Sequence, residues 1–195
     1  MLKSIIDTSH DFATGFFCQI YPKAFARPST KYVKNQGKRN MVVVEIGTDR
    51  GYNARTMLEN LDIKKMYLVD PYLWSEKDGV DLSLAKCGSN EAYAIAQKKL
   101  KKFKNKIEFI LKTSDEAVDD IPDGLDFVYI DAIHTYEWVS KELKLYYPKV
   151  KKGGVIGGHD WFGSFQGVAK AVLEFAENKK LSVRGDEIDW WVLKN

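Results

Sequence analysis

Runs of consecutive apolar residues recur along the chain and are separated by longer stretches with a different pattern. The first run, "MVVVEIG" over residues 41–47, is rich in β-branched side chains. A strand that is covered on both faces has this composition, because neither face meets water. Comparable runs cover residues 65–70, 107–111, 125–131 and 154–158. The pattern therefore predicts five buried strands.

Helical periodicity fills the intervals between these runs. Apolar side chains repeat there at three- and four-residue spacing, as on the buried face of an amphipathic helix. The segments are residues 53–61, 91–103, 135–147 and 167–180. Thr113 and Glu116 have the spacing of a capping box, which predicts a further short helix that begins at Val118 or just before it. Strands that alternate with helices predict a parallel sheet covered by helices on both faces.

The C-terminal end departs from this alternation. Two strand-like runs, residues 181–184 and 188–194, are separated by "GDE". A link this short that contains glycine cannot be a crossover, so it predicts an antiparallel hairpin. Trp190 and Trp191 would point to opposite faces of its second strand and pack there. The expected fold class is α/β: a Rossmann-like seven-stranded sheet of five parallel strands plus a C-terminal antiparallel hairpin, with helices on both faces.

The first forty residues match no strand pattern, and residues 21–40 are rich in turn formers and positive charge. They could form a helical cap over the sheet edge, an oligomer contact or a partly disordered segment, and the sequence leaves these alternatives open. A homo-oligomer is compatible with the second. At 195 residues the chain is most simply one globular domain. We expect an N-terminal helical or irregular cap over residues 1–40 and the main body over residues 41–195.

The composition excludes several classes of protein. With 45% hydrophobic residues and no apolar run long enough for a bilayer, no membrane partner is expected. The opening residues lack a secretory signal pattern and Cys18 and Cys87 cannot form a disulfide framework, so we expect a cytoplasmic location. A net charge of +3 is too small to indicate specific binding of nucleic acid. The lysines of residues 98–106 indicate a solvated helix face or an attraction for an anionic substrate.

The first predicted strand ends in an acid and two glycines, in "EIGTDRG". Ligands of open parallel sheets bind beyond the carboxyl ends of the strands, and a helix start attracts a carboxylate or phosphate. Gly47 and Gly51 would let the backbone approach such a ligand. Their spacing lacks the third glycine of a dinucleotide fingerprint, which argues against a nicotinamide cofactor. Asp70, at the next strand end, is placed to bind ribose hydroxyls or is simply an exposed aspartate.

Four stretches together resemble, in order and spacing, the motifs of class I S-adenosylmethionine-dependent methyltransferases. They are "VEIGTDRGYNA", "LVDPY", "KTSDEA" and "YIDAIHTYEW…KKGGVIGGHDW". The set is most similar to the O-methyltransferase branch that includes catechol and caffeoyl-CoA methyltransferases and the macrocin and cephalosporin-hydroxylase-like group. The resemblance covers residues 41–195. It implies the fold expected above and S-adenosyl-L-methionine as the cofactor.

The resemblance also implies where that cofactor lies. Its carboxylate would be near the helix start at Asn53, its ribose at Asp70 and its adenine beside Ser114. Glu45 would orient the glycine loop or the amino end of the cofactor. The full set of implied cofactor contacts is Glu45, Gly47, Thr48, Asp49, Gly51, Asn53, Asp70, Ser114 and Asp131.

Methyl transfer to an alcohol requires the removal of a proton by a general base, or a cation that stabilises the developing alkoxide. His134 falls where the resembling enzymes carry a catalytic lysine or histidine, so we expect it to be the base, with Asp131 beside it. Capping of the following helix is the alternative role for His134. Asp131 and Asp160 occupy positions that bind a divalent metal in those enzymes, and His159 completes the predicted ligand set for Mg²⁺ or Mn²⁺.

Position 159 departs from the resembling enzymes, which carry an acid there. A neutral imidazole supplies less charge and favours softer ions than Mg²⁺. Alternatively, His159 is not a ligand and Asp131 serves to hold His134. Residues 71–90 are long enough for a lid. Aromatic side chains that could form the acceptor wall are Tyr72, Trp74, Tyr136, Trp161 and Phe162.

The resulting hypothesis is an O-methyltransferase that acts on a hydroxyl of a small molecule or a glycan, an acceptor that could be anionic. Sugars are favoured over catechols, since the D-x-x-H pattern of residues 131–134 is similar to the macrolide-sugar group. One alternative is a catalytically silent accessory protein that only binds the cofactor. A less favoured alternative is an NAD-dependent oxidoreductase.

Overall fold

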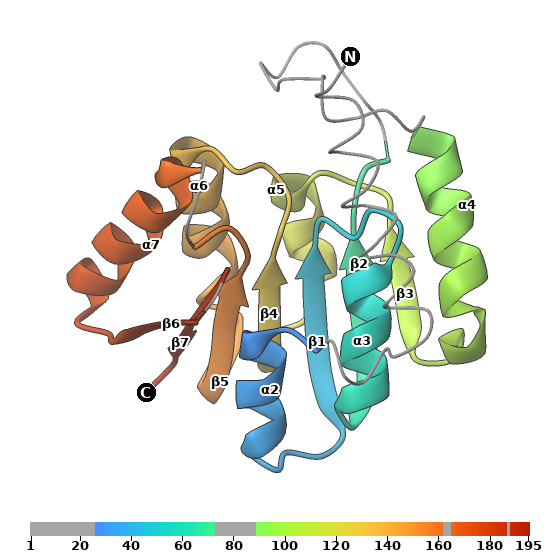
Figure 1. Ribbon diagram of the computed structural model, residues 1–195, viewed down its shortest axis with the longest axis horizontal. Helices are drawn as coiled ribbons and strands as arrows, with labels where there is room; N and C mark the ends of the chain where they lie inside the picture. The colour runs from blue at the N-terminus through green and yellow to red at the C-terminus, as the bar shows by residue number, and fades with distance from the viewer. Residues whose placement is uncertain (1–25, 73–88, 162–164, 187) are drawn as a thin grey trace, which may run out of the picture.

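A single seven-stranded sheet forms the centre of the molecule, and helices cover both of its faces (Figure 1). The computed structural model describes residues 26–72, 89–161, 165–186 and 188–195. The strands lie in the order β3-β2-β1-β4-β5-β7-β6. Their bounds are β1 Met41–Ile46, β2 Ile63–Val69, β3 Ile107–Ile110, β4 Leu125–Ile130, β5 Val150–Gly158, β6 Val183–Asp186 and β7 Asp189–Leu193.

The strand directions confirm the predicted fold class. Strands β1 to β5 pair in parallel, and β7 pairs antiparallel with both β5 and β6. The strand order reverses between β1 and β4, so the carboxyl ends of these two strands lie side by side at the switch point. That edge of the sheet is where a ligand is expected to bind.

Strands β5 and β6 depart most from their predicted bounds. Strand β5 begins at Val150, four residues before the predicted start, because a register shift beside Leu125 lets the exposed Lys151 and Lys152 join the strand. Strand β6 extends to Asp186, which pairs with Asp189. The first two residues of the predicted link "GDE" therefore belong to the strand.

Six α-helices are described. They are α2 Pro28–Asn35, α3 Tyr52–Asn60, α4 Ser89–Leu100, α5 Ser114–Ala117, α6 Tyr136–Tyr146 and α7 Gln166–Lys179. Two 3₁₀ turns, η3 Lys101–Phe103 and η4 Val118–Asp120, continue α4 and α5. The predicted capping box is present, since the Thr113 and Glu116 side chains cap the start of α5 reciprocally. The helix begins at Ser114 instead of at or just before the predicted Val118, because Thr113 is itself the N-cap residue. None of the helices in the described part is long and apolar enough to cross a membrane.

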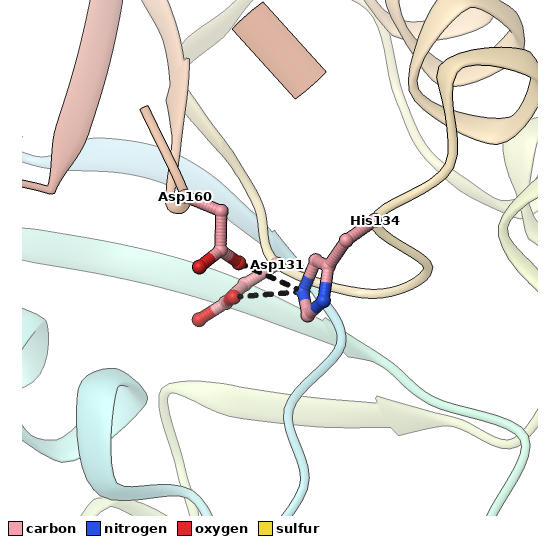
Figure 2. A group of neighbouring side chains, drawn as sticks. All are labelled: Asp131, His134 and Asp160. Carbon is pink, nitrogen blue, oxygen red and sulfur yellow. Dashed lines mark ion pairs between the residues drawn. The ribbon is translucent and has the colours of Figure 1, made fainter. Parts of the chain in front are cut away.

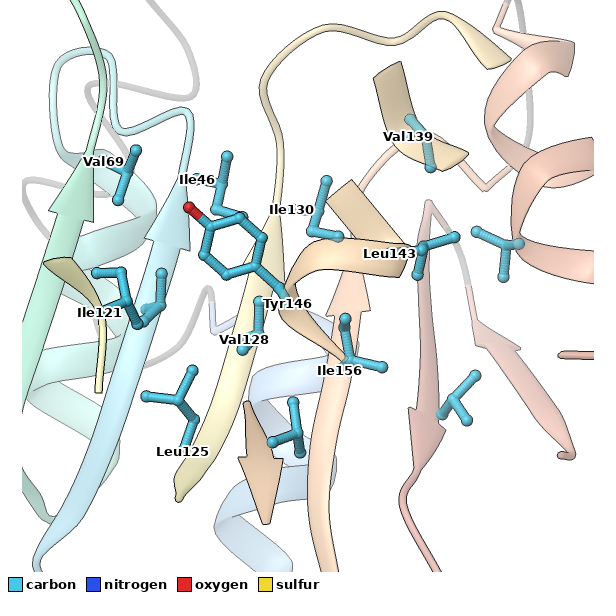
Figure 3. Packing of buried hydrophobic residues seen from close by; sticks show 14 of the residues in the cluster. Ile46, Val69, Ile121, Leu125, Val128, Ile130, Val139, Leu143, Tyr146 and Ile156 are labelled. Atoms are coloured by element: carbon cyan, nitrogen blue, oxygen red, sulfur yellow. The ribbon is translucent and has the colours of Figure 1, made fainter. Parts of the chain in front are cut away.

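The sheet separates two buried cores, one under each helix layer. Helices α5, α6 and α7 cover one face, where Leu143 and Tyr146 pack against Val128, Ile130 and Ile156 of the central strands (Figure 3). Helices α2, α3 and α4 cover the other face. Trp190 belongs to the first core and Trp191 to the second, so both tryptophans pack as predicted.

Residues 26–40 form part of the second layer. Helix α2 buries Val33 in the core, and the Tyr32 ring lies 5.4 Å from the ring of Trp191. Within the described residues this segment covers a face of the sheet rather than its edge. The earlier part of the predicted cap, residues 1–25, lies outside the described residues.

Candidate active site

The loop between β1 and α3 follows an unusual backbone path at the switch point. Gly47, Asp49 and Gly51 have φ angles of 85°, 45° and 70°. A Cβ at Gly47 would lie 2.8 Å from the Cα atom of Ala132, in the chain that leaves β4. A Cβ at Gly51 would meet Leu100 of α4 at 3.1 Å. These glycines are required by positive φ and by protein packing, which is a different reason from the predicted close approach of a ligand.

Glu45 is a buried carboxyl group beneath this loop. Its Oε1 accepts a hydrogen bond of 2.9 Å from the Asn53 amide, at a helix start that has no side-chain cap. Its Oε2 has no hydrogen-bond partner among the described residues. Burial, reinforced by the charge of Asp131, raises the pKa of Glu45 well above its usual range. The neutral form of Glu45 is therefore favoured more than in an exposed carboxyl group.

Asp70 holds the same loop from the end of β2. Its two carboxylate oxygens accept hydrogen bonds from the backbone N–H groups of Asp49, at 2.8 Å, and Tyr72, at 2.9 Å. The Tyr72 hydroxyl donates to the Asp49 carbonyl at 2.7 Å. A carboxylate has about four acceptor positions, so lone pairs remain for the predicted ribose contact.

Ser114 is buried at the first turn of α5, below the end of β3. Its carbonyl accepts a 2.6 Å hydrogen bond from the Tyr146 hydroxyl, and its side chain bonds to the buried carboxyl of Glu142. Helix α6 thus fixes Ser114 from below, while its contact with an adenine stays a prediction.

The predicted catalytic residues meet at the carboxyl ends of β4 and β5. Asp131 follows β4, His134 lies in the loop to α6, and Asp160 follows β5 with a φ of 60°. The His134 Nε2 atom lies 3.1 Å from Asp160 Oδ2 and 3.5 Å from Asp131 Oδ1 (Figure 2). The candidate ligand atoms of the three residues all lie within 4.8 Å of one another. We call these three residues the carboxylate–imidazole cluster.

Two buried atoms of the cluster point at each other without a hydrogen bond. His134 Nε2 and Asp160 Oδ2 have no hydrogen-bond partner among the residues that the structure describes. Burial alone would lower the pKa of His134, but the two aspartates outweigh it, so the pKa is raised above its ordinary value. Burial also raises the pKa of Asp160, against the charges of His134 and Arg27. The arrangement suits a cation, either a proton on His134 or a divalent metal.

His159, directly after β5, faces the same two carboxylates. Its Nδ1 atom is 3.1 Å from Asp160 Oδ1 and 3.7 Å from Asp131 Oδ1. Its carbonyl accepts a 3.1 Å hydrogen bond from the Trp190 indole. The predicted metal set of Asp131, His159 and Asp160 and the observed cluster thus share both carboxylates and differ in the imidazole. The cluster found by distance contains His134.

Sequence reasoning missed Arg27, which reaches the site from the chain before α2. A guanidinium nitrogen of Arg27 lies 3.5 Å from Asp131 Oδ2. A second donates a 2.8 Å hydrogen bond to the Tyr129 hydroxyl and lies 3.7 Å from Asp189 Oδ1. No pattern in the sequence marks this arginine, because it is far from its partners along the chain and belongs to no motif.

Three of the five aromatic side chains predicted for the acceptor wall lie within the described residues: Tyr72, Tyr136 and Trp161. Tyr72 lies at the loop, with its ring 4.9 Å from that of Tyr93. The Tyr136 hydroxyl donates a 2.6 Å hydrogen bond to Glu174, which links α6 to α7. The Trp161 indole lies against Gly185 of β6. Trp74, Phe162 and residues 73–88 of the predicted lid lie outside the described residues.

Comparisons with known proteins agree with the geometry. A family model described as a methyltransferase domain matches residues 44–161. An uncharacterized protein of Acanthamoeba polyphaga mimivirus is 31% identical over 129 residues, which make up 64% of this chain and 53% of that protein. This chain therefore spans about half the length of that relative.

Solved structures share the fold at low sequence identity. A Clostridium thermocellum protein described as an rRNA methylase has a TM-score of 0.63 at 18% identity, over 86% of this chain and 95% of its own. The O-methyltransferase NovP has a TM-score of 0.60 at 16% identity, over 86% and 79%. Aeropyrum pernix fibrillarin with bound S-adenosyl-L-methionine has a TM-score of 0.52 at 14% identity, over 80% and 66%.

Proposed function

The chain belongs to the family of methyltransferase domains, and from that premise we propose that it methylates a hydroxyl group of a small molecule or a glycan. Sugars are favoured over catechols as acceptors. The observation that carries the proposal is the carboxylate–imidazole cluster, which lies at the switch point beside the glycine loop. A transfer to oxygen needs a proton acceptor or a cation at this place, and the cluster offers both.

S-adenosyl-L-methionine would supply the methyl group. The residues fit it: Glu45 Oε2 and Thr48 Oγ1 are buried at the loop without hydrogen-bond partners in the described part of the chain. Glu45 thus has an oxygen available for a hydrogen bond to the cofactor, and the start of α3 attracts a carboxylate. Asp70 offers acceptor positions for ribose hydroxyls.

His134 would take the acceptor's proton. The imidazolium that forms would be stabilised by Asp131 and Asp160, which face its Nε2 atom. The same residues fit a divalent ion such as Mg²⁺ or Mn²⁺, because two carboxylates and an imidazole with buried atoms that have no hydrogen-bond partner among the described residues form a recognised donor set. Asp131 and Asp160 would hold the ion, with His159 or His134 as the third ligand. Such an ion would stabilise negative charge on the acceptor oxygen.

A thermal-shift panel tests the proposed class. S-adenosylhomocysteine at 100 times its Kd should raise the free energy of unfolding by about 2.7 kcal/mol, and NAD should not change it. A response to NAD alone would support the oxidoreductase alternative. The absence of any response to either ligand would exclude both enzyme hypotheses.

Substitution of His134 tests the mechanism. With an acceptor found by screening sugars and catechols for release of S-adenosylhomocysteine, His134→Gln should lower kcat by about 10² or more, because proton removal is lost. The affinity for S-adenosylhomocysteine should stay within about twofold, since Glu45 and Asp70 are unchanged. The silent accessory protein would be favoured by two results together. The protein would bind S-adenosylhomocysteine without any acceptor being found, and substitutions in the carboxylate–imidazole cluster would leave the affinity for S-adenosylhomocysteine unchanged.

A further inference from the structure

Arg27 places a permanent positive charge directly against Asp131. The two oxygens of Asp131 face different partners: Oδ2 lies 3.5 Å from the Arg27 guanidinium, and Oδ1 lies 3.5 Å from His134 and 3.7 Å from His159. The oxygen that faces the imidazoles is the one available to a metal. The other oxygen already has a cation.

The guanidinium is held in place by groups on the far side from the cluster. The Tyr129 hydroxyl accepts a hydrogen bond from Arg27 and donates one of 2.9 Å to Asp189 Oδ1. Asp189 is fully buried, and its Oδ2 accepts hydrogen bonds of 2.5 Å and 3.2 Å from the hydroxyl and backbone N–H of Ser29. Arg27 therefore lies between two carboxylates, one in the cluster and one behind it.

Both Arg27 and Asp189 lie outside residues 44–161, the part that the family model matches. The segment before α2 and the last strand thus add a charge pair to the shared core of the domain. Its effect on the cluster follows from Coulomb's law, since a fixed positive charge opposes a second cation on the same carboxylate.

We propose that Arg27 is a resident cation that lowers the affinity of the carboxylate–imidazole cluster for a divalent metal, and that Asp189 offsets part of this effect. The inference rests on the proposed function in that it assumes the cluster is the metal site. The metal dependence of this chain is then set by the Arg27–Asp189 pair as well as by the metal ligands. A weakly held, exchangeable ion is the expected state of the unmodified protein.

The experiment measures Mn²⁺ binding to the full chain by the electron paramagnetic resonance of free Mn²⁺, with S-adenosylhomocysteine present. Arg27→Gln removes the positive charge and should tighten Mn²⁺ binding by about tenfold or more. Asp189→Asn removes the opposing negative charge with little change of shape and should weaken Mn²⁺ binding severalfold. Arg27→Lys keeps the charge and should remain close to the unmodified protein.

A matched control is Arg39→Gln, which removes an arginine of the same segment that is 84% exposed and pairs with Asp62. It should leave Mn²⁺ affinity within about twofold, because exposed charges are screened. If Arg27 only supported the structure, Arg27→Gln and Asp189→Asn would both weaken Mn²⁺ binding, and that result would overturn the inference. So would an unchanged affinity in both variants.

The Mn²⁺ experiment can also be decided if Arg27→Gln does not fold. Should Arg27→Gln not fold, Asp189→Asn and Arg27→Lys carry the test together: the proposal requires weaker Mn²⁺ binding in Asp189→Asn and unchanged binding in Arg27→Lys. Weaker binding in both variants, or unchanged or tighter binding in Asp189→Asn, contradicts the proposal. Should the unmodified protein bind no Mn²⁺, Arg27→Gln must bind it. An unmodified protein that does not bind S-adenosylhomocysteine would instead refute the proposed function, which is a separate outcome.

Discussion

Asp131 shows how much one side chain can link. Its oxygens face Arg27, His134 and His159, and its backbone carbonyl group fills the space beside Gly47. The residue thus joins the glycine loop, the candidate base and the N-terminal segment. Substitution of Asp131 would disturb all three, which is why the experiments above change its neighbours instead.

Glu142, on α6, is a second carboxyl group whose environment decides its charge. Its side chain is 1% exposed, and burial raises its pKa from the ordinary 4.5 to about 7, with Asp115 and Asp131 adding to the rise and Ser114 and His134 opposing it. The folded state therefore binds this proton more tightly than the unfolded state. Stability from this group is complete below about pH 4.5 and is lost as the pH rises through about 7.

Glu142→Gln should remove this dependence, because the amide cannot ionise. At pH 8 we expect the free energy of unfolding of the variant to exceed that of the unmodified protein by about 1–3 kcal/mol. Near pH 4 this difference should vanish. Urea unfolding at both pH values measures it. Glu137→Gln, an exposed position on the same helix, is the control and should show no such difference. If Glu137→Gln changed the free energy of unfolding at pH 8 as much as Glu142→Gln does, the raised pKa of Glu142 would not be the cause.

At the scale of elements, the loop between β1 and α3 depends on its contact with the end of β4. The backbone N–H of Asp131 donates to the Ile46 carbonyl at 2.8 Å, and the N–H of Gly47 donates to the Val69 carbonyl at 2.9 Å. The loop is therefore tied to both neighbouring strands before any ligand binds. Its shape is a property of the sheet.

Gly47→Ala should be much more harmful than the same change at a glycine of equal backbone conformation. Gly47 and Gly124 both have a φ of 85°, but a Cβ at Gly124 meets nothing within 4 Å. The left-handed conformation alone costs about 1–2 kcal/mol. The collision with the β4 end should add about 1–3 kcal/mol at Gly47 and lower the affinity for S-adenosylhomocysteine. Urea unfolding and calorimetric titration test this, and equal losses at the two sites would show that the β4 end gives way.

At the scale of the whole molecule, the two cores account for most of the apolar burial. The layer of α5, α6 and α7 buries Leu143 completely, whereas Leu173 on the neighbouring helix α7 is 52% exposed. Both residues are leucines in helices of the same layer. They differ in whether water reaches them.

Leu143→Ala should lower the free energy of unfolding by about 2–5 kcal/mol, because it removes buried contacts and leaves a cavity in the core that also contains Ile130, Val139 and Ile156 (Figure 3). Leu173→Ala should change it by no more than about 0.5 kcal/mol. Thermal or urea unfolding of both variants gives the comparison. Similar losses at the two positions would mean that the α7 leucine is covered by another surface in solution.

The local pattern of the sequence determined the elements and the identity of the chemical groups. Strands buried on both faces have continuous apolar sequences, and the short link that contains glycine predicted the hairpin. Both patterns can be recognised from neighbouring residues alone. The end of each strand then located Asp131, His134 and Asp160 at one edge of the sheet. The α/β class and the family resemblance were correct for this reason.

Only the tertiary structure decided which groups face one another. Arg27 contacts Asp131, and Glu142 bonds to Ser114, across long stretches of chain that carry no mark of the pairing. Likewise, Gly47 is filled by the β4 end, which the loop sequence alone did not indicate. Charge, burial and steric fit depend on side-chain directions set by packing, so they are fixed only when distant elements come together.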